Sequence, residues 1–88
     1  MDKYNGWTNY ATWRVNLELF DGMGLDHVAA DPDPESADVA DVADLLRSIA
    51  EEAVYETTRE GIGRDYALAF ISDVDFEEIA RHMIDDFA

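Results

Sequence analysis

Carboxylates are the side chains with which this chain could do the most chemistry. The sequence carries 21 Asp and Glu against 6 Lys and Arg, which gives a net charge of −15 over 88 residues. Between Val15 and Leu46 there are nine acids and no Lys or Arg. Paired carboxylates can act as general acid and base. At this density any two acids lie near each other, so their proximity alone does not indicate acid–base catalysis.

The other patterns that support catalysis or metal binding are missing from the sequence. His27 and His82 stand in separate segments without the spacing of metal ligands, and there is no cysteine to form a thiolate site. Segment 31–35, with the sequence DPDPE, alternates acids as a calcium-binding loop does, but it lacks the glycine that such a loop needs. No glycine-rich phosphate loop occurs. We therefore expect a protein that is not an enzyme and holds no metal or cofactor.

The arrangement of the acids instead favours a binding surface. On a helix, carboxylates four residues apart lie about 6 Å apart along the axis. Phosphates along a DNA strand are spaced on a comparable scale, with a rise of about 3.4 Å plus rotation. A basic nucleic-acid-binding protein could accept such an array, whereas direct binding to nucleic acid would need Lys and Arg. The candidate partner-binding residues are Asp31, Asp33, Glu35, Asp38, Asp41, Asp44, Glu51, Glu52, Glu56, Glu77, Glu78, Asp85 and Asp86.

Helices must position these acids, because apolar residues recur at spacings of three and four and no strand-like alternation competes. The pattern predicts an all-α fold, a single acidic helical domain over residues 1–88. The expected architecture is a small four-helix bundle with helices at about 8–21, 34–60, 63–72 and 76–87. A further single turn is expected between residues 25 and 30.

The first helix has clear start and stop signals. Thr8 or Asn9 is the expected N-cap, and Gly22 is suited to the position after the C-terminus. Its expected buried stripe consists of Tyr10, Trp13, Leu17 and Phe20. Trp13 is thus placed in the core, whereas Trp7 suits either the core or an exposed anchor for a partner.

The second helix is expected to begin at Asp33, as N-cap, with Pro34 as its first residue; Ser36 is a second candidate cap. It should end near Arg59, with Gly61 beyond its end. Its expected buried stripe consists of Val39, Val42, Leu46, Ile49 and Ala53.

The last two helices differ in the strength of their signals. The third is expected to bury Tyr66, Ala69 and Phe70. The fourth begins with a capping box of Asp75 and Glu78, which the hydrophobic residues Val74 and Ile79 flank as a staple. Its expected buried stripe consists of Phe76, Ile79, Ala80, Met83 and Phe87.

Two segments of the chain resemble small proteins of phages and other mobile elements. Residues 5–13, NGWTNYATW, are similar to their N-G-W-T-N-x-x-T-W opening, and residues 75–80, DFEEIA, to their acidic-aromatic helix. Ala11 stands where many of these proteins carry Glu, which weakens the N-terminal cap here. The resemblance covers both ends, leaves the acidic middle unmatched and carries over no catalytic residue. Within this setting the chain is similar to anti-CRISPR proteins acting on type I-C systems.

That resemblance implies a phage protein that helps its carrier to evade host defence. Together with the charge, it favours a non-enzymatic, DNA-mimic-like inhibitor that blocks target DNA binding by a type I surveillance complex such as Cascade. The alternative is a phage or plasmid adaptor module in which Tyr4 and Trp7 anchor a protein and the acidity serves solubility or adaptation to salt. Direct competition and allosteric inhibition both remain open. No signal-like or membrane-spanning segment occurs, which favours the cytoplasm of a bacterial host.

Overall fold

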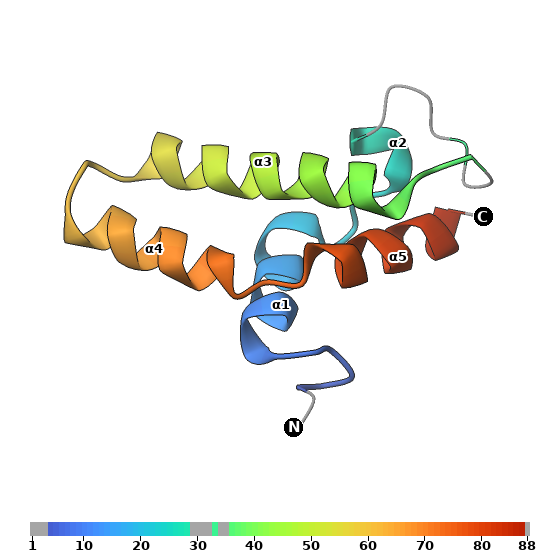
Figure 1. Cartoon of the computed structure of the whole chain (residues 1–88), viewed down its shortest axis with the longest axis horizontal. Helices are drawn as coiled ribbons and strands as arrows, with labels where there is room; N and C mark the ends of the chain where they lie inside the picture. Colours follow the sequence, from blue (N-terminus) through green and yellow to red (C-terminus); the bar gives the residue numbers. More distant parts are fainter. Residues whose placement is uncertain (1–3, 29–32, 34–35, 88) are drawn as a thin grey trace.

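The computed structural model describes residues 4–28, 33 and 36–87 (Figure 1). Throughout that part of the chain the regular structure is helical and no strand forms, which confirms the all-α fold. The only pairing of the strand type there is an isolated bridge between Tyr4 and Trp7. The helical segments are α1 (Tyr10–Val15), the π-helical turn η1 (Asn16–Phe20), α2 (Leu25–Val28), α3 (Val39–Thr57), α4 (Ile62–Ser72) and α5 (Phe76–Phe87).

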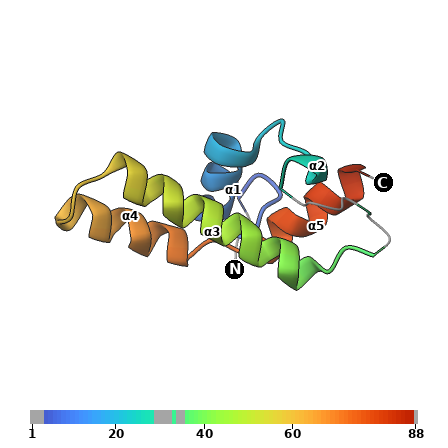
Figure 2. The ribbon, with the colours of Figure 1, turned by 90° about the horizontal axis from the view of Figure 1, so that it is seen from above.

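The long helix α3 organises the molecule. It lies along α4 and α5, which follow each other nearly end to end beneath it (Figure 1). Seen from above, α1, η1 and α2 lie on one side of this layer (Figure 2). The molecule measures 41 × 32 × 20 Å, and its shortest dimension equals about two helix diameters. A molecule this thin has a small core and a large surface for its length.

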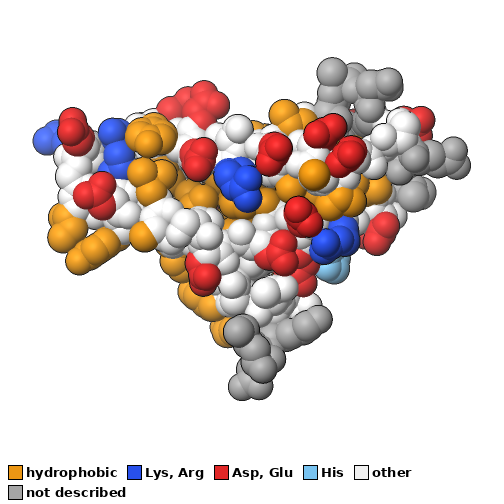
Figure 3. Space-filling model, viewed as in Figure 1, with side chains coloured by type: hydrophobic (Ala, Val, Ile, Leu, Met, Phe, Trp, Pro, Cys, Tyr) orange, Lys and Arg blue, Asp and Glu red, His pale blue; other side chains and the backbone are white. Residues whose placement is uncertain are grey.

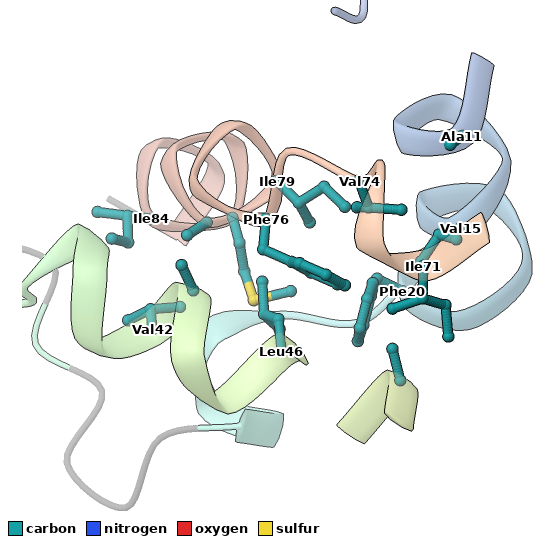
Figure 4. Close-up of a cluster of buried hydrophobic side chains, with 14 of the residues drawn as sticks. Ala11, Val15, Phe20, Val42, Leu46, Ile71, Val74, Phe76, Ile79 and Ile84 are labelled. Atoms are coloured by element: carbon teal, nitrogen blue, oxygen red, sulfur yellow. The ribbon is translucent and has the colours of Figure 1, made fainter. Parts of the chain in front are cut away.

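The core lies between α3, α5 and the α1–η1 segment (Figure 4). The stripe predicted for α5 is confirmed at Phe76, Ile79, Ala80 and Met83, and Ile84 is buried as well; the side chain of Phe87 lies outside the described residues. The stripe predicted for α3 is confirmed in part. Two of its members, Val42 and Leu46, are buried. The rest of the buried face of α3 consists of Ala43, Ala50 and Val54.

The prediction for the first helix was wrong in its buried face. Of the expected stripe only Phe20 is buried, whereas Tyr10 and Leu17 are exposed and Trp13 is half-buried. The smaller side chains of Ala11, Thr12 and Val15 face the core instead. Small residues let α1 approach the layer beneath closely, which bulky rings would prevent.

The π-helical turn explains why the stripe shifts within this helix. A π-helix pairs residues five apart, so Val15 and Phe20 come to the same side although an α-helix would separate them. Gly22, with φ of +80°, follows the end of this turn as predicted. Trp7, in the N-terminal lead-in, is partly buried and packs against the core, which was the role expected of Trp13.

The second helix begins later than predicted. Its N-cap is Asp38, whose Oδ1 accepts hydrogen bonds from the backbone N–H of Ala40 (2.8 Å) and Asp41 (3.3 Å). Asp33 instead takes part in a turn, since its carbonyl accepts from the N–H of Ser36 at 3.1 Å. Asp38 directly precedes the residues of α3 that pack on the core. Core packing therefore favours a helix start at Asp38 over the start predicted at Asp33. Pro34 lies outside the described residues.

The prediction for the third helix was also wrong in its buried face. On α4 the buried residue is Ile71, with Ala67 and Leu68 partly buried, whereas Tyr66 and Phe70 are exposed. Arg64 helps to fix this orientation. It donates hydrogen bonds to the carbonyls of Tyr55 and Thr58 at the C-terminus of α3, and its guanidinium lies 4.7 Å from the Tyr55 ring centroid.

The start of α5 shows half of the predicted capping box. The Oδ1 of Asp75 accepts from the N–H of Glu78 at 3.1 Å, and both staple residues, Val74 and Ile79, are buried. The reciprocal bond is replaced by bonds to distant residues. The N–H of Asp75 donates to Oγ1 of Thr12 (2.9 Å), and Oε1 of Glu78 accepts from the N–H of Thr8 (2.9 Å).

Asn9 completes this connection between the two ends of the chain. Of the two predicted caps it is the one that forms, since its Oδ1 accepts from the N–H of Thr12 at 2.8 Å. Its Nδ2 donates to the carbonyl of Asp73 at 2.8 Å. The two segments that carry the family resemblance therefore hold each other in place, which gives Thr8, Asn9 and Thr12 a structural role.

Candidate functional site

The acids of α3 lie together on its solvent side. At 100° per residue four of them fall on the arc opposite the buried stripe of Val42, Leu46 and Ala50, and the other two, Asp38 and Glu56, flank that stripe; all six are exposed. The row from the first acid to the last extends about 27 Å along the helix axis. We refer to this row as the α3 acidic face, which consists of Asp38, Asp41, Asp44, Glu51, Glu52 and Glu56.

A single guanidinium interrupts the α3 acidic face. Arg47 donates to Oδ1 of Asp44 at 3.3 Å, and its Cζ lies 5.3 Å from the centroid of the Phe76 ring. Within the described part of the chain, the other acids of this face have no ion-pair partner. The face therefore keeps most of its negative charge.

The predicted acids of α5 divide into two groups. Glu77, Asp85 and Asp86 are exposed, and Glu77 accepts from Arg81 at 3.4 Å. Glu78 is half-buried and binds the N–H of Thr8, so its carboxylate is already used to hold the fold together. The acids of α5 therefore offer fewer free carboxylates to a partner than the α3 acidic face does.

The remaining predicted acids precede α3. Asp33 is exposed within its turn, whereas Asp31 and Glu35 lie outside the described residues. In the space-filling view, separate acidic side chains lie along α3, on α5 and at the end of the molecule where α3 and α4 meet, and hydrophobic side chains with a few basic ones lie between the α3 and α5 groups (Figure 3). The visible face is therefore strongly negative but not uniformly so.

An aromatic cluster is the feature that sequence reasoning missed. Tyr4 stacks against Tyr10 and Trp13 with centroid distances of 5.0 and 4.9 Å, and Tyr10 lies 6.2 Å from Phe70. Tyr10, Trp13 and Phe70 were expected in the core, yet Tyr10 and Phe70 are exposed and Trp13 is half-buried. Tyr4 is exposed as well. The signal was present in the sequence, because apolar residues occupy two opposite sides of segment 62–72.

The histidines lie apart, as their positions in the sequence indicated. The ring of His82 stacks on Trp7 at 4.4 Å, whereas Nδ1 of His27 accepts from the N–H of Gly24 at 2.9 Å. A hollow of about 300 Å³ beside Trp7 and His82 is lined mainly by segment 21–24 and α5. Across the described residues, no three His, Asp or Glu side chains come together in a way that could hold a metal ion.

The helices and the whole sequence were also compared with membrane spans and with known proteins. None of the helices in the described ranges is long and apolar enough to cross a membrane. No curated protein and no solved structure matches the chain. One family model matches nearly the whole length of the chain, including residues 5–13 and 75–80, which hydrogen-bond to each other. The chain belongs to the family of unknown function DUF7249, whose model matches residues 1–86.

Proposed function

We propose that this protein is a non-enzymatic inhibitor that binds a basic nucleic-acid-binding surface through the α3 acidic face. One observation carries the proposal: six exposed carboxylates follow one side of a single helix, and among the described residues only Asp44 of these six pairs with an arginine. An ordinary solvated surface mixes both signs of charge. A row of this kind is complementary to a groove that is lined with Lys and Arg to receive phosphates.

The physical consequence is fast, salt-sensitive association. Opposite charges steer two proteins together and raise the association rate at low ionic strength, and salt reduces this effect. Because α3 is held by the core and capped at both ends, its carboxylates are already in place before a partner arrives. Such preorganisation lowers the entropic cost of binding.

The resemblance to anti-CRISPR proteins of type I-C systems makes the Cascade complex the first target to test. Inhibition by occupying its DNA channel would require no catalytic residue. The experiment measures binding of labelled target DNA to purified type I-C Cascade by fluorescence anisotropy, with increasing amounts of this protein. We expect the protein to displace the DNA at low salt and to lose this effect as salt rises.

A matched pair of variants tests whether the location of the charge matters. The first neutralises four unpaired acids of the α3 acidic face: Asp41→Asn, Glu51→Gln, Glu52→Gln and Glu56→Gln. The second neutralises the same number of exposed acids elsewhere: Asp21→Asn, Asp26→Asn, Glu60→Gln and Asp65→Asn. Both have the same net charge.

We expect the inhibition constant of the first variant to rise at least about tenfold, which corresponds to about 1.4 kcal/mol. The inhibition constant of the second variant should stay close to that of the parent. Equal losses in both variants would show that only the total charge matters, as expected for a protein adapted to salt. Unchanged DNA binding at saturating protein and low salt would contradict Cascade as the target. In that case a pull-down with the same two variants as baits would decide between another basic target and the adaptor alternative.

A further inference from the structure

Helix α4 is apolar on two opposite sides. One side belongs to the core through Ile71, with Ala67 and Leu68 partly buried. The other side carries Ile62, Tyr66, Ala69 and Phe70, which are spaced as a core-facing stripe and are all exposed. A helix that is apolar all round is normally covered on both sides. The second side of α4 therefore lacks the cover that its sequence pattern predicts.

This side of α4 continues onto α1 and the N-terminal lead-in. Phe70 contacts Tyr10, and Tyr10 contacts Tyr4, through the ring pairs described above. Figure 3 shows hydrophobic side chains along the free margin of α4 and on toward α1. We refer to this surface as the aromatic face, which consists of Tyr4, Tyr10, Ile62, Tyr66, Ala69 and Phe70.

The exposed area of the aromatic face is large for so small a chain. The exposed fractions are 39% for Tyr4, 44% for Tyr10, 70% for Tyr66, 38% for Phe70 and 67% for Ile62. At about 200 Å² for a whole aromatic side chain, the four rings alone expose about 400 Å². That is about half of the 800 Å² or so that each partner buries in a standard interface, before Ile62 and the surrounding polar rim are added.

The aromatic face also has a shape that can receive a projecting side chain. A hollow of about 740 Å³ lies between α1 and α4, bordered by Asn9, Tyr10, Phe70 and Asp73, among others. Tyr66 lines this hollow and, at 70%, is highly exposed for a large apolar residue. One molecule thus carries both a projecting ring and a hollow, as a two-fold symmetric contact requires.

We propose that the aromatic face is covered by the same face of a second copy of this chain, with the two α4 helices antiparallel. The apolar positions of α4 are centred near residue 67, which is also the midpoint between Gly61 and Asp73. No side chain caps the N-terminus of α4 at Gly61, and Asp73 is exposed at the other end. In the antiparallel pair the partner's Asp73 meets this uncapped, partially positive N-terminus.

The charge distribution favours self-association through this surface, because few charges lie on it. Each copy has a net charge of −15, so two copies repel each other. Segment 61–72 contains a single acid, Asp65, and a single arginine. Salt screens the repulsion between the acidic surfaces and leaves the apolar contact in place, so dimerisation becomes stronger as salt rises. This dependence is opposite to that of the proposed inhibitory contact, and the inference does not depend on that function.

The experiment is sedimentation equilibrium of the full chain, whose monomer has a mass of 9.9 kDa. We expect a monomer–dimer equilibrium in about 1 M NaCl, with a Kd at least about tenfold weaker near 0.1 M. Tyr66→Ser should raise the Kd by about thirtyfold, because a central interface ring is removed. Asp73→Asn should weaken the dimer near 0.1 M NaCl, through the loss of its charge at the partner's helix terminus, and should have little effect in about 1 M NaCl, where salt screens that charge.

Leu45→Ser provides the matched control, since Leu45 is an exposed apolar residue on the opposite, α3 side of the layer. It should leave the Kd unchanged, and circular dichroism should show all three variants to be folded. A chain that stays monomeric at about 1 mM protein in both salts would overturn the proposal. So would a dimer that Leu45→Ser weakens and Tyr66→Ser does not, or association that continues beyond the dimer.

Discussion

Thr12 is a buried polar residue that connects two distant parts of the chain. It is fully buried, donates to Oδ1 of Asn9 at 2.7 Å and accepts from the N–H of Asp75 at 2.9 Å. Its hydroxyl thus joins the cap of α1 to the start of α5. A buried N–H that loses its acceptor costs the free energy of its lost hydration.

Thr12→Val keeps the shape of the side chain and removes the hydroxyl. We expect the free energy of unfolding to fall by about 1–3 kcal/mol, measured by urea denaturation. Thr57→Val is the control, because the Thr57 hydroxyl donates to the Ala53 carbonyl at an exposed position of α3. Thr57→Val should change the free energy of unfolding by no more than about 0.5 kcal/mol. Equal effects of the two substitutions would show that the bond to Asp75 contributes nothing specific.

At the level of the helices, Asp38 combines two roles. It caps α3 through Oδ1 and belongs to the α3 acidic face. Asp38→Ala should destabilise the protein by about 1 kcal/mol, whereas Asp38→Asn should retain most of the cap because the amide oxygen accepts the same bonds. Thermal unfolding of the two variants measures the difference. A loss of stability in Asp38→Asn as large as in Asp38→Ala would indicate that charge, and not capping, anchors the helix start.

The helices also show what could be predicted from the sequence. The capping signal of Asp75 and the stripe from Phe76 to Met83 predicted α5 correctly, because local and tertiary preferences agree there. On α1 and α4 the bulky apolar side chains dominate the sequence pattern, but the core accepts the smaller ones, such as Ala11 and Val15. On α4 the spacing shows two apolar sides without saying which one packs on the core, and on α1 a π-helical turn shifts the buried face without a signal in hydrophobic spacing.

The candidate site was predictable to a similar extent. Exposure of the α3 acids followed from helical periodicity, since most of them lie opposite the apolar stripe. The role of Glu78 did not, because its partner Thr8 lies 70 positions away in the sequence. The exposure of Tyr66 and Phe70 likewise depends on which of two apolar sides of α4 packs against α3.

For the whole molecule, the excess of acids opposes folding through self-repulsion. Raising NaCl from about 0.01 to 1 M shortens the screening length from about 30 to 3 Å. We therefore expect the Tm to rise by at least about 4–8 °C, which corresponds to about 1 kcal/mol for a domain of this size. Differential scanning calorimetry at low protein concentration measures this change in the monomer.

The variant with four neutralised acids on the α3 acidic face is the control for this prediction. It should be more stable than the parent at low salt and should gain less from added NaCl. Chloride is used because sulfate also strengthens apolar burial. A salt response that is the same in both proteins would show that these acids do not oppose folding.

The hydrogen bonds between the first and last parts of the chain have a consequence for biosynthesis. Thr8 needs Glu78, and the Asp75 N–H needs Thr12, across separations of 70 and 63 positions. A ribosome releases the N-terminal partner first, at about 5–20 residues per second. The small-residue side of α1 therefore lacks these partners until α5 has been made. Folding of this domain can therefore be completed only after α5 has emerged from the ribosome.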